Sequence, residues 1–111
     1  MIETIILDHL ATALSVPVTM EMPKNPGGTF VVLEKTGSGR SNHICSAIFA
    51  VQSYAPSLLQ AAQLNERVKS AMNTLPTLDP ICAARLNSDY NFTDTANKHY
   101  RYQAVYDITH Y

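Results

Sequence analysis

The side chains that could carry out chemistry are few, and their spacing predicts no reaction. The 111 residues contain four histidines and two cysteines, none at the short spacings that metal-binding motifs use. His43 and Cys45 stand two residues apart and would share one face of a strand, but two ligands do not complete a zinc site. A Cys–His nucleophile pair would need a third group to orient its base, and none can be identified. We therefore expect no catalytic residue, no bound metal and no cofactor.

The segment Thr36-Gly37-Ser38-Gly39-Arg40-Ser41 has a composition similar to that of a phosphate-binding loop. It lacks the Gly-x-x-x-x-Gly-Lys-Ser/Thr spacing, and it is expected to join two strands, whereas a phosphate-binding loop precedes a helix. We interpret it as the polar, mobile connection of a β-hairpin.

Composition and charge indicate a folded domain that binds no polyanion. Hydrophobic residues make up 46% of the chain, charged residues 15%, and the formal net charge is -1. Nucleic-acid-binding surfaces usually carry clustered lysines and arginines, whereas the eight basic residues here are scattered. No apolar run is long enough to span a membrane, and acidic residues occur where a signal peptide needs positive charge. These features favour a single cytosolic domain with Cys45 and Cys82 as reduced core residues.

The elements that would position any site are organised around residues 42–75. Residues 42–54 are mostly apolar and contain no glycine or proline, which predicts a long strand. Its apolar residues fall on both parities, as expected of a central strand that is covered on both sides or faces a partner. Pro56 suits the first turn of a following helix. The apolar stripe of that helix comprises Leu58, Ala61, Leu64 or Asn65, Val68, Ala71, Met72 and Leu75.

The remaining segments complete an α+β domain. Residues 2–14 show helical spacing, and Pro17 and Pro23 bracket a short edge strand at 18–22. A turn follows at 23–28, and the other predicted elements are strands at 29–35, 81–86 and 100–108 and a polar loop at 87–98. The predicted order is α-β-β-β-α-β-β: an antiparallel or mixed sheet of about five strands with two helices packed on it, in one domain of residues 1–111. A ferredoxin-like fold is the second choice, because its first helix follows a strand.

The last predicted strand places Tyr100, Tyr102 and Tyr106 on one face. Aromatic residues on a sheet can stack on nucleic-acid bases, but without a basic surface they favour packing in a core or at an interface. Two helices can cover only about one face of a single sheet. We therefore expect the chain to associate with itself through the sheet.

Several stretches taken together resemble one known family. They are Val16-Pro17-Val18, Gly28-Thr29-Phe30-Val31-Val32-Leu33-Glu34-Lys35-Thr36-Gly37, Ala50-Val51-Gln52-Ser53-Tyr54-Ala55, Ala61-Ala62-Gln63-Leu64-Asn65-Glu66-Arg67-Val68 and Tyr100-Arg101-Tyr102-Gln103-Ala104-Val105-Tyr106-Asp107. Over nearly its whole length, the chain is similar to the tail terminator, or tail completion, proteins of long-tailed, lambda-like phages and prophages. These stretches are packing patterns and carry no chemical signature.

The resemblance implies a sheet with two helices and a structural, non-enzymatic role. Family members form a hexameric ring on the end of the finished tail tube, stop its growth and offer a docking surface to the head. The implied partners are further copies of the chain, the major tail tube protein and a head-completion or connector protein. The implied location is the host bacterial cytoplasm during assembly and then the head-proximal end of the virion tail. Candidate assembly contacts are Thr36, Gly37, Ser38, Gly39, Arg40, Tyr100, Tyr102 and Tyr106, together with the predicted loop at 87–98.

Other functions stay open on the sequence alone. The chain could be a different head–tail joining protein of the connector or neck, or a small homo-oligomeric α+β module that binds a ligand. It could also be a small enzyme whose site crosses a subunit boundary. Gene neighbourhood separates these possibilities, since a tail terminator lies between head-completion genes and the gene for the major tail protein.

Overall fold

The structure is a computed structural model that describes residues 1–24, 28–97 and 99–111. Within these residues, a 3₁₀ turn, η1 (Leu75–Thr77), accompanies two α-helices and five strands. Their order is α1 (Ile2–Ala13), β1 (Val18–Thr19), β2 (Phe30–Ser41), β3 (Ile44–Ala55), α2 (Leu58–Met72), β4 (Ile81–Asn91) and β5 (Tyr100–His110). The predicted α+β class and the order α-β-β-β-α-β-β are confirmed.

The strands of the described chain form one mixed sheet in the order β1-β2-β3-β5-β4. Strands β2, β3, β5 and β4 are antiparallel neighbours, but β1 pairs in parallel with β2. The sheet is therefore mixed, which is one of the two predicted forms, and β1 is shorter than the predicted 18–22. Pro17 and Pro23 lack the N–H groups that a longer ladder needs. The carbonyl of Pro17 accepts a hydrogen bond from the Val31 nitrogen at 2.9 Å.

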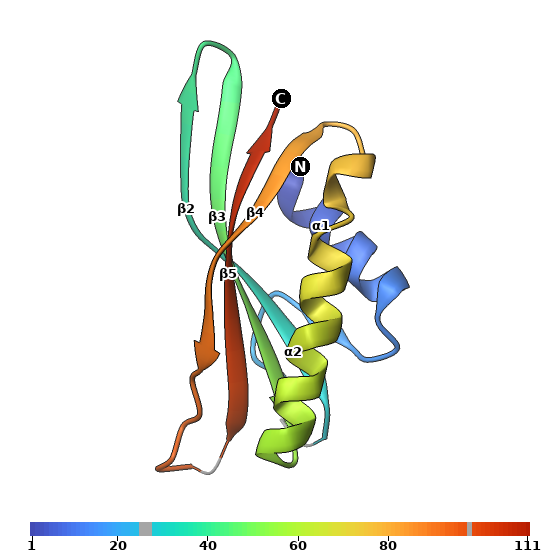
Figure 1. Cartoon of the computed structure of the whole chain (residues 1–111), viewed down its shortest axis with the longest axis vertical. Coiled ribbons are helices and arrows are strands. Elements are labelled where there is room, and N and C mark those ends of the chain that lie inside the picture. The colour runs from blue at the N-terminus through green and yellow to red at the C-terminus, as the bar shows by residue number, and fades with distance from the viewer. Residues whose placement is uncertain (25–27, 98) are drawn as a thin grey trace.

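Both helices lie on the same side of the sheet, and the core lies between the two layers (Figure 1). The predicted stripe of α2 is buried at Ala61, Leu64, Asn65, Val68, Ala71 and Met72, and Leu75 is buried just beyond it. The exception is Leu58, in the first turn, which is 40% exposed. Ser57 caps the helix by accepting a hydrogen bond from the Gln60 nitrogen at 3.2 Å, so Pro56 precedes the cap and lies outside the first turn.

The β2–β3 hairpin is longer than predicted, because residues 36–41 belong to β2 and form no loop. After a bulge, residues 37–41 pair with residues 44–48. The turn consists of Asn42 and His43, with φ of 51° and 66°, the left-handed conformation that two-residue hairpin turns use. Glycine and serine have low strand propensity. Here the apolar strand β3 supplies the hydrogen-bonding partner that holds them in a strand.

Strand β4 also continues past its predicted end, through residues 87–91 of the predicted loop. Strand β5 pairs with it as far as Asn91, which lies opposite Tyr102. The predicted turn at 23–28 and the predicted loop at 87–98 include residues 25–27 and 98, which lie outside the described residues.

Both cysteines are free thiols, but neither is a core residue as predicted. Cys45 is half-buried and Cys82 is exposed. The register of β4 shifts between Ile81 and Ala83, on either side of Cys82. At this shift Ile81 points into the core and is 5% exposed, whereas Cys82 points to the surface.

Candidate assembly surface

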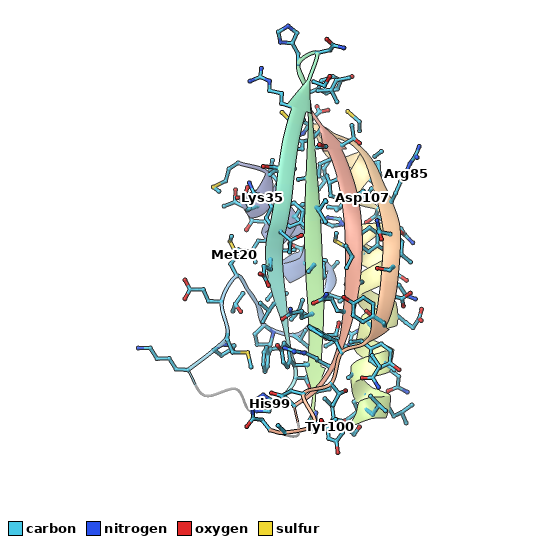
Figure 2. All side chains as sticks on the ribbon, turned by 90° about the vertical axis from the view of Figure 1, so that its left-hand side faces the viewer. Met20, Lys35, Arg85, His99, Tyr100 and Asp107 are labelled. Carbon is cyan, nitrogen blue, oxygen red and sulfur yellow. The ribbon has the colours of Figure 1, made fainter. Side chains whose placement is uncertain are left out.

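One face of the sheet carries neither helix, and Figure 2 views the molecule from that side, with α1 and α2 behind the strands. Successive strand residues point to opposite faces, so the register of β2–β5 identifies the side chains on this surface. We call it the open face. Part of it is buried, because Phe30, Val32, Ala50 and Tyr54 are each at most 6% exposed. Its other main members are Glu34, Gly37, Gly39, Ile44, Ile48, Gln52, Arg85, Ser88, Tyr90, Arg101, Gln103, Val105 and Asp107.

Large apolar side chains are exposed on the open face. Ile44 is 43% exposed, and Ile48 and Tyr90 are each 41% exposed. The side chain of Ile48 packs against the backbone of β2 at Gly37, where an added Cβ atom would lie 3.6 Å from Cδ1 of the isoleucine. Apolar side chains on an uncovered sheet face are what a contact surface between proteins needs.

The predicted contact residues 36–40 lie in the outer half of β2, close to the start of α1, because Ser38, Gly39 and Arg40 line one hollow together with Ile2. Gly37 is half-buried, and Thr36, Ser38, Gly39 and Arg40 are exposed. The structure thus brings these residues to the surface in a paired strand. Their role as assembly contacts stays a prediction.

The three predicted tyrosine contacts point away from the open face, toward the helices. Tyr106 has no exposed surface, and its hydroxyl lies 3.3 Å from Oδ1 of Asn73 at the end of α2. Burial raises the pKa of this phenol. A side chain enclosed in the core cannot touch another subunit, so we correct the prediction at Tyr106. Tyr100 and Tyr102 are half-buried, and their role as contacts stays a prediction.

A hydrogen-bonded group that the sequence did not predict crosses the open face. Arg101 Nη1 donates to the Tyr54 hydroxyl at 2.8 Å, and that hydroxyl donates to Oε1 of Gln52 at 3.1 Å. Gln52 Nε2 donates to Oε1 of Gln103 at 2.9 Å. Gln103 Nε2 donates to the Tyr90 hydroxyl at 2.6 Å. Four side-chain hydrogen bonds therefore connect β3, β5 and β4.

Aromatic rings and a cation surround this group. The guanidinium of Arg101 lies 4.2 Å from the ring centroid of Phe92, and its Nε donates to the Phe92 carbonyl at 2.6 Å. The rings of Tyr90 and Phe92 meet edge to face at 5.7 Å. Phe30 stacks on Tyr54 with ring centroids 4.6 Å apart. We call Gln52, Tyr54, Tyr90, Phe92, Arg101 and Gln103 the Tyr–Gln patch. Tyrosine and arginine are the residue types that dominate interface energetics.

The sequence contained a weak signal for this patch. Gln52 and Gln103 are amides within two predicted strands, and each adjoins an apolar residue in the sequence. Buried amides require hydrogen-bonding partners, so their presence indicates a polar contact. Only the register, which places Gln52 opposite Gln103 and Tyr90 opposite Gln103, identifies the partners.

The hollows of the described surface include one that is too small for most ligands and others of about 350 to 390 Å³. The one beside Tyr54 and His99 has a volume of about 110 Å³, well below the roughly 300 Å³ at which ligand pockets begin. A wider hollow of about 360 Å³ at the hairpin end is lined by Arg40, Cys45 and His110, with no carboxylate among its described lining residues. Within the described residues, no three His, Cys, Asp or Glu side chains are grouped to hold a metal ion.

Two ion pairs on the helix side connect a helix to the sheet. Lys69 Nζ lies 2.9 Å from Oδ2 of Asp89 on β4 and 3.0 Å from Oε1 of Glu66. Hydrogen bonding to Lys69 lowers the pKa of Asp89, and hydrogen bonding to Asp89 raises the pKa of Lys69. Lys35 and Glu3, 3.1 Å apart, join β2 to α1 in the same way.

Comparisons with known proteins identify no family for this chain. No protein-family model matches the chain, and no curated protein matches it. In the described residues, neither helix has the length and apolar character to cross a membrane.

Proposed function

We propose that this chain is a phage-tail structural protein of the tail terminator type. Copies of it form a closed ring on the end of the tail tube, stop tube growth and present a docking surface to the head. The observation that carries the proposal is the open face, a sheet surface that neither helix covers and on which Ile44, Ile48 and Tyr90 are exposed.

The dimensions of the molecule suit this role. Its principal extents are 44, 25 and 24 Å, and the open face runs along the longest of them (Figure 2). A standard protein–protein interface buries roughly 800 Å² on each partner, which a face of this length and width can supply. The formal net charge of -1 causes little repulsion between copies.

Ring closure requires a heterologous contact, in which the open face of one copy meets a different surface of the next. The tip of the β2–β3 hairpin extends beyond the helices (Figure 1), and the outer half of the hairpin supplies a further contact with the tail tube protein or the head-completion protein. Residues 36–40 lie there, and this position is why we keep them as candidate contacts.

The test is a tube-capping assay with matched variants. The major tail tube protein is polymerised in the presence of the chain, and tube length is measured by electron microscopy. We expect wild-type protein to cap the tubes and stop their growth. Ile48→Lys places a charge on the open face and should abolish capping, whereas Leu59→Lys alters a residue of α2 that is 68% exposed and should cap normally.

Uncapped tubes with the wild-type chain would contradict the terminator role. Capping by Ile48→Lys as efficiently as by wild type would contradict the part played by the open face. A two-fold dimer that buries this face, with no ring on any tube, would favour the homo-oligomeric ligand-binding module instead.

A further inference from the structure

Cys45 belongs to a row of side chains that crosses three strands near the hairpin end of the sheet. The register places Arg40 of β2 opposite Cys45 of β3, and Cys45 opposite His110 of β5. Residues directly opposite in antiparallel strands point to the same face, with Cβ atoms about 4.5–5.5 Å apart. That face is the one that carries the helices, because Ala47, two residues along β3, is buried in the core. Cys45 therefore stands between a guanidinium and an imidazole.

This row borders the hollow of about 360 Å³ at the hairpin end, to which Lys35 and Ile2 also contribute. Lys35 lies 3.1 Å from Glu3, so these two charges offset each other. Arg40 has no ion pair within residues 1–24, 28–97 and 99–111, and its charge is therefore not offset in this way. His110 adds a further positive charge when it is protonated. The hollow beside the thiol is accordingly positive.

The two thiols of the chain differ in these surroundings. Cys45 is half-buried, whereas Cys82 is exposed at the irregularity in β4. The two residues on each side of Cys82 in the sequence are uncharged. Reactive cysteines in proteins occupy partly exposed sites with positive charge nearby, and exposure alone does not create such a site. By this criterion the less exposed thiol, Cys45, is the distinctive one.

We propose that Cys45 is a thiol–disulfide exchange site for small disulfides that carry carboxylates. Arg40 attracts the carboxylates into the hollow and so raises the local concentration of the disulfide. Cys45 releases its proton to water, and its sulfur attacks one sulfur of the disulfide. A new S–S bond forms as the old one breaks, and the other half leaves as a thiolate. The chain then carries a mixed disulfide in the hollow, and this chemistry does not depend on the proposed ring.

The test measures charge selectivity, because a ratio of rates cancels the difference in exposure between the thiols. Each thiol is studied alone in the full chain: Cys45 in the Cys82→Ser variant and Cys82 in the Cys45→Ser variant. Dithiodipropionate, with two carboxylates, and cystamine, with two ammonium groups in their place, are the matched disulfides. Mass spectrometry gives the rate of mixed-disulfide formation with each. At low ionic strength, we expect the ratio of the anionic to the cationic rate to be about tenfold higher at Cys45 than at Cys82.

Substitutions in the Cys82→Ser chain then locate the source of the selectivity. Arg40→Gln should remove the preference for the anionic disulfide, and Arg40→Lys, which keeps the charge, should retain it. Arg67→Gln is the control for net charge, because Arg67 is exposed on α2, and this variant should also retain the preference. Equal ratios at the two thiols would overturn the inference. A preference that survives Arg40→Gln, or one that Arg40→Lys loses as fully as Arg40→Gln, would overturn it as well.

Discussion

Val68 lies at the centre of the interface between α2 and the sheet and has no exposed surface. Replacing it by aspartate removes roughly 1.5–3 kcal/mol of apolar burial. It also encloses a carboxyl group without a partner, at a further cost of roughly 1–3 kcal/mol even when the group is protonated. The sum, about 4 kcal/mol, is near the upper limit for single substitutions and approaches the entire stability of a small domain. We therefore expect Val68→Asp to be largely unfolded or barely stable.

Urea denaturation followed by circular dichroism measures this loss. For a slope of about 2 kcal/mol per molar urea, a loss of about 4 kcal/mol lowers the midpoint by roughly 2 M. The penalty should shrink as pH falls toward about 4 and then stay constant, because below that pH the unfolded state also protonates the new carboxyl group. Leu59→Asp is the control on the same helix: its side chain is 68% exposed near the helix N-terminus, where an acid is tolerated. Equal midpoints for the two variants would refute the placement of the core.

Three smaller perturbations test other parts of the structure. Asp89→Asn should destabilise the fold by at most about 1 kcal/mol near neutral pH, because it removes the ion pair with Lys69. The fold lowers the pKa of Asp89, so the difference in melting temperature from wild type should vanish as pH falls through that lowered pKa. A difference that stays constant down to about pH 2 would contradict the ion pair. His43→Gly should raise the free energy of unfolding by about 1 kcal/mol, because glycine adopts the left-handed turn conformation without strain; a lower melting temperature would mean that the turn lies elsewhere. Gly39→Val should lower the melting temperature slightly, because a Cβ there would lie 3.1 Å from Ser46 Oγ; hydrogen exchange unchanged throughout the hairpin would contradict that contact.

Local periodicity was enough to predict the fold class and most of the buried face of α2. The stripe through Ala61, Val68 and Met72 repeats with the helical period, and each of these residues is buried in α2. The alternation of β5 likewise predicted that Tyr100, Tyr102 and Tyr106 share a face, and the register of β3 and β5 confirms it. Such patterns require only neighbouring residues, because an element covers its core with one side.

Predictions that depend on a partner strand were less accurate. Residues 36–41 and 87–91 have the composition of loops, yet each pairs with an apolar strand that fixes its backbone. The alternation of β5 could not show which of its faces meets the helices. For that reason the tyrosines were predicted as surface contacts, while the Tyr–Gln patch on the opposite face was missed.

Self-association through the open face is the central claim, and size-exclusion chromatography with light scattering tests it most directly. Wild-type protein should shift with rising concentration, or on addition of tail tubes, from a monomer to one discrete species of about six copies with closed cyclic symmetry. Electron microscopy of that species should show rings, and Ile48→Lys should prevent their formation. A monomer that forms no ring at any concentration or on tail tubes, or a two-fold dimer as the largest species, would contradict the claim.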